Sequence, residues 1–339
     1  MTDDEALDMI AKGHAALVAN RKPVVEPPVV IPPRPPEPVK EVTVALGGLA
    51  KAISGAESGV RLLVSETTSA SFALRDVAGP ATGVTVDLSK VKIGNLQVAG
   101  VANVEFLGLD LNIAQVRNSK AIRFTRANVH DSSTSGLGFY SCQGVVVTAS
   151  TFTNLRNGIA HDHCDDVTVS GNRFTGMTSD GVTGVGGVRV RIENNDFQDF
   201  KPSTGAHPDA VQLFTTNAKR SSTDIIVRGN RIRRGAGGIT QGVFITTNTG
   251  FEAFRYARVE VADNLIEGGM YNGIMASGVD DLTIARNTVQ PYTDQKSWIR
   301  IANCSGVRMD GNAYAQLLLE GVSGLDRRDK ETLSAIAPR

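Results

Sequence analysis

The chain has 339 residues, of which 41% are hydrophobic and 21% are charged, and its 35 lysines and arginines balance its 35 aspartates and glutamates. A formal net charge of zero argues against a general nucleic-acid partner and against an anionic membrane surface. No apolar run approaches the length of a membrane span, and the acidic, amphipathic N-terminus is unlike a signal peptide or a transit peptide.

Residues 1–22 carry the pattern of a short amphipathic helix. Thr2 and Glu5 form a capping box, in which each side chain satisfies a backbone N–H group that the first helical turn leaves free. The apolar seam steps by three and four residues, as in a coiled coil, and consists of Leu7, Ile10, His14 and Leu17. Because a helix of this length is marginal on its own, we expect it to dock on copies of itself or on a partner.

Residues 23–41 follow as a proline-rich linker. Eight of the thirteen prolines of the chain fall between positions 23 and 38. Such a segment favours the extended polyproline conformation, which spans about 3 Å per residue and behaves as a semi-rigid spacer. We therefore expect it to separate the N-terminal helix from the main domain.

From residue 42 to residue 320 the chain is organised by an internal repeat of the form apolar-x-apolar-x-x-Asn-x-apolar. Its first position is occupied in turn by Val84, Val104, Ile122, Val145, Val167, Val190, Ile225, Val259, Leu282 and Val307. Two-residue alternation indicates strands with one buried side. A unit of strands and turns alone cannot bury its apolar side, so the copies must stack. The stacked solution is an all-β fold, a parallel β-helix of about ten rungs.

The asparagines and cysteines of the repeat have structural interpretations. Asn172, Asn287 and Asn312 share one turn position, where the side-chain amide can bond its own backbone and the asparagine of the next rung. The three cysteines share another position, which is a valine on a fourth rung. We therefore predict small core residues there, and neither a disulfide nor a metal framework.

The two ends of a β-helix need covers, because each end exposes an open core and an unpaired strand edge. Residues 42–64 predict a strand, a short helix and a second strand, and we expect the helix at 49–53 to cover the first end. Residues 317–319 are the candidates for closing the other end. Residues 321–339 form a separate tail, predicted as a short helix or a loose segment.

Residues 42–320 resemble the right-handed parallel β-helix of the pectin-lyase-like superfamily. The resemblance is carried by the Asn-Gly-Ile strands at 157–159 and 272–274, the Val-x-Val-x-x-Asn-x-Phe strands and the helix ahead of the first rung. With its N-terminal helix and proline-rich stalk, the whole chain resembles a bacteriophage tailspike or related virion fibre. This resemblance implies right-handedness and a homotrimer. It also implies synthesis in the host cytoplasm without a signal peptide, and attachment to a phage tail or baseplate protein through residues 1–22.

Two consecutive rungs, which begin at Val190 and Ile225, are longer than the others. Their extra residues fall on the same corners, where insertions in adjacent rungs would wall a groove across the strands between them. The outward side chains of these strands give a candidate substrate-binding stripe of Gln212, Thr183 and Phe244, since amides bond hydroxyl groups and an aromatic ring stacks on a pyranose. An exposed stripe without function is the alternative.

Asp209 and Asp180 are candidate catalytic residues because they share one position on adjacent rungs. Neighbouring rungs lie about 4.8 Å apart, close to the separation of about 5–5.5 Å between the carboxyl groups of a retaining glycosidase. Mutual repulsion would raise the pKa of one carboxyl group, as an acid catalyst requires. Amides fill the position on other rungs, among them Asn157 and Gln241, so a structural polar ladder is the alternative.

His207 lies two residues before Asp209 and is the third catalytic candidate. An imidazole titrates near neutral pH and can act as an acid or a base, although it can also merely bond a backbone carbonyl group. On the next rung, Arg233 and Arg234 could bind the carboxylates of an acidic polysaccharide, as a uronate lyase needs. A solvated basic rim is the alternative for these arginines.

His161 and His163 flank Asp162, a run that raises the possibility of a metal site. No third ligand follows at a useful spacing, and His161 falls at a core position of the repeat. We therefore predict no metal and no cofactor.

Three functional hypotheses follow. The first is a virion-attached, tailspike-like protein that binds and depolymerises a host surface polysaccharide, with hydrolysis through Asp209, Asp180 and His207 favoured over lyase chemistry. The second is a non-catalytic glycan-binding adhesin or structural virion fibre, because the scaffold alone does not specify an activity. The third is a cellular uronate lyase or epimerase.

Overall fold

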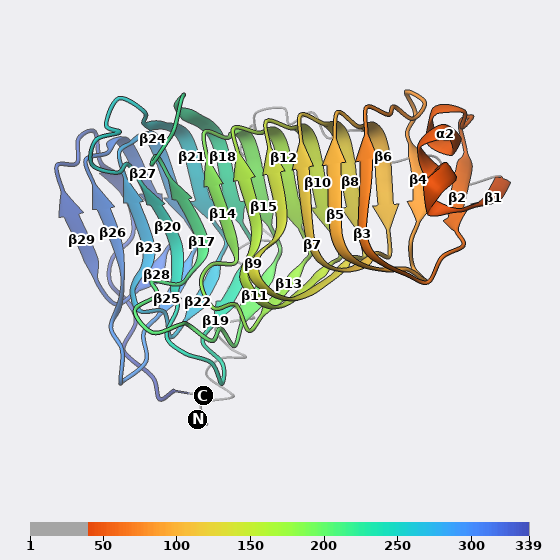
Figure 1. Cartoon of the computed structure of the whole chain (residues 1–339). Helices are drawn as coiled ribbons and strands as arrows, with labels where there is room; N and C mark the ends of the chain where they lie inside the picture. Colours follow the sequence, from red (N-terminus) through yellow and green to blue (C-terminus); the bar gives the residue numbers. More distant parts are fainter. Residues whose placement is uncertain (1–39, 339) are drawn as a thin grey trace.

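The chain winds into one coil of short strands, and each strand pairs in parallel with the equivalent strands of the neighbouring rungs (Figure 1). The computed structural model describes residues 40–338. Within that range, no helix has the length and hydropathy of a membrane span. The predicted N-terminal helix, residues 1–22, and the linker as far as residue 39 lie outside the described residues.

Sheet 1 is formed by the first strand of each rung and contains thirteen strands. Ten of them, β4 to β27, carry the ten first positions of the predicted repeat, and β1, β2 and β30 extend the sheet at its ends. The strands are β1 (Lys40–Val44), β2 (Val60–Val64), β4 (Val84–Asp87), β6 (Ala102–Leu107), β8 (Lys120–Thr125), β10 (Gln143–Thr148), β12 (Asp165–Ser170), β15 (Val188–Glu193), β18 (Ser222–Arg228), β21 (Tyr256–Ala262), β24 (Val279–Ala285), β27 (Ser305–Asp310) and β30 (Asp326–Arg327).

Sheets 2 and 3 are formed by the rest of each rung. In the early rungs one long strand serves both sheets: β3 (Thr68–Arg75), β5 (Lys92–Ala99), β7 (Asp110–Arg117), β9 (Asn128–Tyr140) and β11 (Thr151–Asp162). Later rungs have a short strand in sheet 2, namely β13 (Arg173–Thr175), β16 (Asp196–Gln198), β19 (Arg231–Arg233), β22 (Leu265–Glu267), β25 (Thr288–Gln290) and β28 (Ala313–Tyr314). Their sheet 3 strands are β14 (Val182–Val185), β17 (Asp209–Phe214), β20 (Gln241–Thr246), β23 (Tyr271–Ser277), β26 (Ser297–Ala302) and β29 (Leu317–Glu320).

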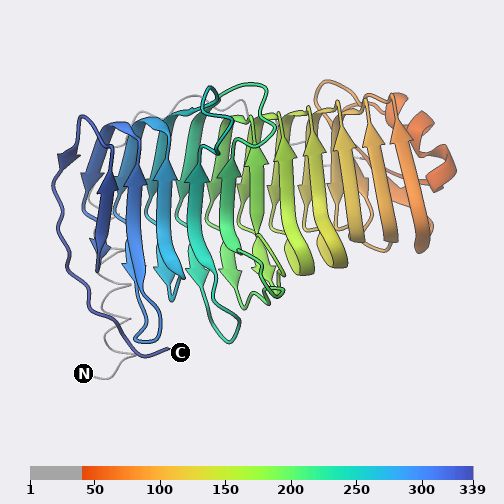
Figure 2. The same cartoon turned by 60° about the vertical axis from the view of Figure 1, so that its left-hand side comes forward.

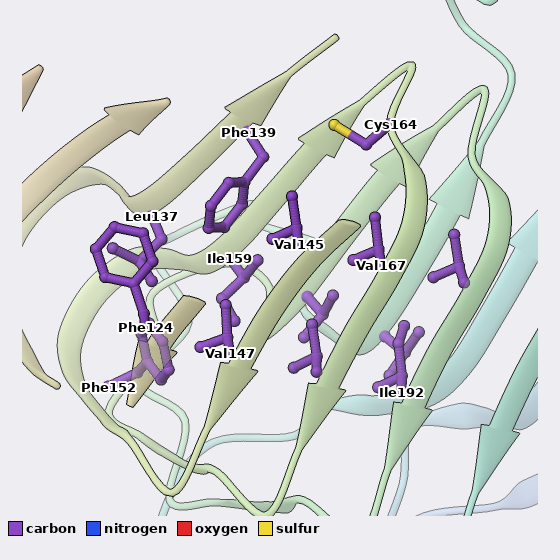
Figure 3. Close-up of a cluster of buried hydrophobic side chains, with 14 of the residues drawn as sticks. Phe124, Leu137, Phe139, Val145, Val147, Phe152, Ile159, Cys164, Val167 and Ile192 are labelled. Carbon is purple, nitrogen blue, oxygen red and sulfur yellow. The ribbon is translucent and has the colours of Figure 1, made fainter. Parts of the chain in front are cut away.

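The core lies inside the coil, because alternate side chains of the strands within the coil point inward. In β27, for example, Val307 and Met309 are buried while Arg308 and Asp310 are exposed. Figure 3 shows valines, isoleucines and phenylalanines of successive rungs converging on this interior. Three phenylalanines stack at nearly parallel angles, with ring centroids 4.7 Å apart and then 4.6 Å apart, in the column Phe152, Phe174 and Phe197. The three cysteines are free and buried, as predicted.

The first end of the coil is covered as the sequence predicts. The 3-10 turn η1 (Leu46–Gly48) leads into the helix α2 (Leu49–Ser54), which lies at one end of the coil (red in Figure 1). Leu49 and Ile53 are fully buried in the core. The helix therefore shields the apolar interior that the first rungs would otherwise expose to water.

An asparagine ladder runs through the bend between sheets 1 and 2. Its buried members are Asn172, Asn195, Asn230, Asn264, Asn287 and Asn312. Within it, Asn264 Oδ1 accepts a hydrogen bond from the backbone N–H of Asn230 at 2.9 Å. Its Nδ2 donates to Asn287 Oδ1 and to the carbonyl oxygen of Val227, each at 2.9 Å. The ladder thus satisfies backbone groups that the bend leaves without a strand partner.

The C-terminal tail closes the ladder in an extended conformation. Asp329 takes the place of the next asparagine, because its Oδ2 accepts the backbone N–H of Asn312 at 3.2 Å. The tail also donates backbone hydrogen bonds to the last rung, among them Arg328 N–H to the carbonyl of Met309 at 2.9 Å. Of the two alternatives for the tail, a short helix or a loose segment, the structure shows no helix in residues 321–338, because main-chain groups of the tail bond to the neighbouring rungs (dark blue in Figure 2).

We predict that Asn264→Ala lowers the free energy of unfolding by about 3 kcal/mol, because it removes four hydrogen bonds and leaves buried backbone groups unpaired. Asn128→Ala, at an exposed position, is the matched control and should cost less than about 1 kcal/mol. Urea unfolding of both variants measures the difference. Equal losses in the two variants would contradict a stabilising role for the ladder.

Candidate functional site

The two long rungs meet at the bend that leads into the middle of sheet 3, where β17 and β20 begin. Residues 199–208 precede β17 and residues 234–240 precede β20. The backbone N–H of Gly238 donates to the carbonyl of Phe200 at 2.7 Å, and that of Gln241 donates to the carbonyl of Pro208 at 2.9 Å. The insertions of adjacent rungs therefore stack on the same corner, as predicted from their lengths.

The predicted substrate-binding stripe lies on the outer side of sheet 3. Gln212 projects between the buried residues Val211 and Leu213. Its register partners on the adjacent rungs are Thr183 and Phe244, so the three side chains are direct neighbours. Gln212 and Phe244 are partly exposed, whereas Thr183 is buried. The placement of the stripe is as predicted, and its role in binding stays a prediction.

Asp180 and Asp209 are adjacent on successive rungs, and their contacts follow a ladder. Asn157 Oδ1 accepts the backbone N–H of Asp180 at 3.1 Å, and Asp180 Oδ1 accepts the backbone N–H of Asp209 at 2.9 Å. The carboxylate of Asp180 thus accepts a backbone N–H group of the next rung, just as the side-chain amide of Asn157 does one rung earlier. Asp180 is 6% exposed, and burial raises its pKa. Of the two interpretations, these contacts favour a structural ladder for Asp180.

Asp209 is fully buried and pairs with an exposed imidazole. Its Oδ2 accepts hydrogen bonds from His207 Nδ1 at 3.1 Å and from Gln212 Nε2 at 2.8 Å, while its Oδ1 has no protein partner. Burial raises the pKa of Asp209 to about 7. The side chain of His207 is 52% exposed, and its hydrogen bond to Asp209 raises the pKa of the imidazole. The pair therefore couples a proton-exchanging group at the surface to a buried carboxyl group.

A chain of amide hydrogen bonds connects His207 to three further rungs. Trp298 Nε1–H donates to Asn272 Oδ1 at 2.9 Å, Asn272 Nδ2 donates to Gln241 Oε1, and Gln241 Nε2 contacts the ring nitrogens of His207. An indole nitrogen can only donate, so the direction of the whole chain follows from Trp298. His207 then accepts from Gln241 through one nitrogen and donates to Asp209 through the other, which is a neutral imidazole oriented by a carboxylate.

The hydrogen bonds that connect Gln241, Asn272 and Trp298 to His207 were not predicted from the sequence. The signal for the two amides was present, because both share the repeat position of Asp209. Trp298 carried no such signal, since the pairing of β23 with β26 shifts register between Asn272 and Ile274. Phe244 also contacts the site, with its ring centroid 5.1 Å from that of His207 in an edge-on arrangement.

Arg233 and Arg234 do not join the His207 pair. Arg233 forms an ion pair with Asp196 at 3.2 Å and also bonds Gln198. Arg234 reaches across two rungs to Asp294 at 3.1 Å. Both guanidinium groups therefore have protein partners, and their role toward a substrate carboxylate stays a prediction.

His161 and His163 are separated by the fold. His161 is 3% exposed inside the coil, both of its ring nitrogens lack a partner, and burial lowers its pKa to about 4. The imidazole of His161 has room inside the coil because its neighbour on the next rung is Gly184. A Cβ atom at that position would lie only 2.1 Å from His161 Nε2. His163 instead faces outward and accepts the backbone N–H of Lys219 at 2.9 Å. Within residues 40–338, no group of three or more His, Cys, Asp or Glu side chains could hold a metal ion.

Comparison with known proteins concerns the coil as a whole. A model of the family described as "Right handed beta helix region" matches residues 112–289. No curated protein sequence gives a significant match.

Solved structures share the fold at low sequence identity. The tailspike protein of Escherichia coli bacteriophage HK620, solved in complex with a hexasaccharide, is 11% identical with a TM-score of 0.59 over 87% of this chain and 60% of its own. PfbA, a surface adhesin of Streptococcus pneumoniae, is 12% identical with a TM-score of 0.53 over 84% of this chain and 83% of its own. At these identities the likeness shows a common fold and nothing about the site.

We predict that Asp209→Asn lowers the pKa of His207. The protonated imidazole is stabilised by the carboxylate beside it, so an uncharged amide removes that stabilisation and the ring loses its proton at lower pH. NMR titration of the histidine ring signals measures the change, with His207→Gln to assign the signal. Asp196→Asn, which removes a carboxylate bonded to Arg233, is the control. An unchanged His207 pKa in Asp209→Asn would contradict the pairing.

Proposed function

Because the chain belongs to the right-handed beta helix family, we propose that it binds a polysaccharide along sheet 3 and transfers a proton to or from that ligand through His207. The observation that supports this most directly is the half-exposed imidazole held against a fully buried carboxyl group. The imidazole lies at one end of the outward stripe of Gln212 and Phe244, with its ring centroid 5.1 Å from that of Phe244. This arrangement offers both a surface for sugar rings and a group that titrates near neutral pH.

The contacts favour His207 over the two aspartates as the residue that touches the ligand. Hydrolysis by two carboxyl groups requires both to reach the glycosidic bond, and both Asp180 and Asp209 are buried. Asp209 then acts through His207, by orienting the imidazole and by balancing its charge when it is protonated. Elimination from a uronate also needs a base at this position, and His207 would supply it.

The similar structures support a glycan as the ligand. The bacteriophage HK620 protein is a tailspike that was solved with a hexasaccharide, and PfbA is a surface adhesin. Both have TM-scores above 0.5 with this chain. By analogy we propose that the ligand is a polysaccharide of a host cell surface.

A second candidate function is a glycan-binding adhesin or structural fibre without catalysis. The specific observation in its favour is that Asp180 accepts a backbone N–H group, as an asparagine of a ladder does. On this hypothesis the ligand binds along the same stripe and keeps its chain length.

We predict that the purified chain shortens a bacterial surface polysaccharide and that His207→Ala reduces the rate by about 100-fold or more, the usual contribution of a positioned acid or base. Released reducing ends and the ultraviolet absorbance of unsaturated products measure hydrolysis and elimination separately. His130→Ala is the matched control, since His130 is also paired with a carboxylate, Asp110, at 2.9 Å but lies on β9.

Two outcomes would contradict the proposed catalysis. Cleavage that persists in His207→Ala would exclude His207 as the acid or base. Binding of polysaccharides without any cleavage would favour the adhesin.

We also propose that the chain is a virion protein, a homotrimer attached to a phage tail or baseplate protein through residues 1–22. The support is the heptad-like seam of that segment and the proline-rich stalk that follows it. A structure with three chains would place three copies of sheet 3 around one axis.

We predict that deletion of residues 1–22 reduces the mass in solution from three chains to one, because the seam would hold the chains together. Ile10→Asp on the seam should have the same effect, whereas Lys12→Asp off the seam should not. Light scattering measures the mass. A trimer that survives the deletion would show that the contacts lie in the β-helix.

A further inference from the structure

An aromatic pair, one ring exposed and the other partly exposed, lies on sheet 3 beyond the His207 pair. The rings of Tyr271 and Trp298 lie 5.3 Å apart between centroids with an angle of 31° between their planes. Tyr271 is 49% exposed, more than any other large hydrophobic side chain in residues 40–338. Nothing in the core requires this ring, so its position needs another explanation.

The backbone at Tyr271 is held in the left-handed region, with φ at +40°. Such a conformation is costly for a bulky side chain, because the Cβ atom approaches the following carbonyl oxygen. Tyr271 is the only Tyr, Phe or Trp among the left-handed residues that the structure describes. Positive φ recurs at many turns of this coil, so the conformation belongs to the fold, and what distinguishes Tyr271 is the bulky, exposed ring that occupies it.

Trp298 is fixed in orientation by its polar edge. Its indole N–H donates to Asn272 Oδ1 at 2.9 Å, and Asn272 in turn bonds Gln241, which contacts His207. The Trp298 ring is therefore oriented before any ligand arrives, which reduces the entropy lost on binding. Strands β17, β20, β23 and β26 are consecutive, so the rungs of His207 and Trp298 are about 14 Å apart.

The surroundings of the pair favour a sugar over a protein partner. Only two other large hydrophobic residues in the described part of the chain are exposed, Leu319 and Leu325, so no broad apolar patch is present. An open hollow of about 470 Å³ lies nearby and reaches Ser297, the register partner of Tyr271, although neither ring of the pair lines it. Its lining mixes polar residues, among them Lys296 and Gln316, with apolar ones such as Pro291. Aromatic faces beside amides and charged groups suit a hydroxylated ring.

We propose that Tyr271 and Trp298 form a sugar-stacking subsite for the polysaccharide that reaches His207. A pyranose would lie with its C–H face against the aromatic pair, and the next sugars would extend either toward His207 or into the neighbouring hollow. The subsite rests on the proposed function for the identity of its ligand, but its binding is measured without cleavage.

The test uses the fluorescence of Trp298, the single tryptophan of the chain. Full-length protein carrying His207→Ala, which leaves the ligand intact, is titrated with purified bacterial capsular and O-antigen polysaccharides and with their oligosaccharides. We expect at least one of them to change the fluorescence, and Tyr271→Ala in the same background to weaken its binding about tenfold. Tyr140→Ala is the control, because Tyr140 lies on β9 with the guanidinium of Arg117 over its ring at 4.1 Å.

A second variant separates binding from folding. Tyr271→Gly removes the ring and relieves the left-handed strain, because glycine adopts this conformation freely. We expect its melting temperature to be at least that of the parent and its affinity to fall as in Tyr271→Ala. A lower melting temperature with unchanged affinity would make Tyr271 a structural residue and overturn the proposal.

The remaining outcomes distinguish the subsite from the proposed catalysis. A fluorescence change together with weaker binding in Tyr271→Ala, but no cleavage by the parent chain, would contradict the proposed catalysis and support the subsite. Cleavage by the parent chain with an unchanged KM in Tyr271→Ala would overturn the subsite and leave catalysis intact. No fluorescence change with any polysaccharide would also overturn the subsite.

Discussion

The hydrogen bonds between successive rungs are the constraint on which the rest of this structure depends. Parallel pairing places equivalent residues about 4.8 Å apart, so side chains that are 18 to 35 residues apart in sequence become direct neighbours. Where the chain bends and strand pairing stops, side chains continue the pairing, most clearly in the buried asparagine ladder that ends at Asp329. Core packing, the polar columns and the aromatic pair all follow from this one register.

Two polar columns use the same geometry with different chemistry. The column of Asn264 consists of neutral amides that satisfy backbone groups and cannot exchange protons near neutral pH. The column of Asp209 replaces two amides by carboxyl groups, and burial moves the pKa of Asp209 to about 7. A buried carboxyl group with a raised pKa next to an exposed imidazole is an arrangement that functional sites often show, which is why this departure from amides marks the candidate site.

The amide chain from Trp298 to His207 joins the proposed binding surface to the proposed proton-transfer group. Because the indole nitrogen only donates, it sets the direction of every hydrogen bond as far as the imidazole. A ligand that moved Trp298 would therefore act on the orientation of His207 through side chains already in contact. His207, Asp209 and Gln241 lie on the two long rungs, whereas Asn272 and Trp298 lie on the two rungs that follow.

The sequence by itself determined the coil, the ten repeats, the asparagine ladder, the cover at α2 and the adjacency of Asp180 and Asp209, because each repeat forms one rung and its period sets which residues are neighbours. Only the tertiary structure decided how deeply a side chain lies and which partner it has. Asp209 proved fully buried and bonded to His207, Arg234 crosses two rungs to Asp294, and the tail lies extended along the last rung. Loops and bulges have no period, so their contacts depend on packing between distant segments.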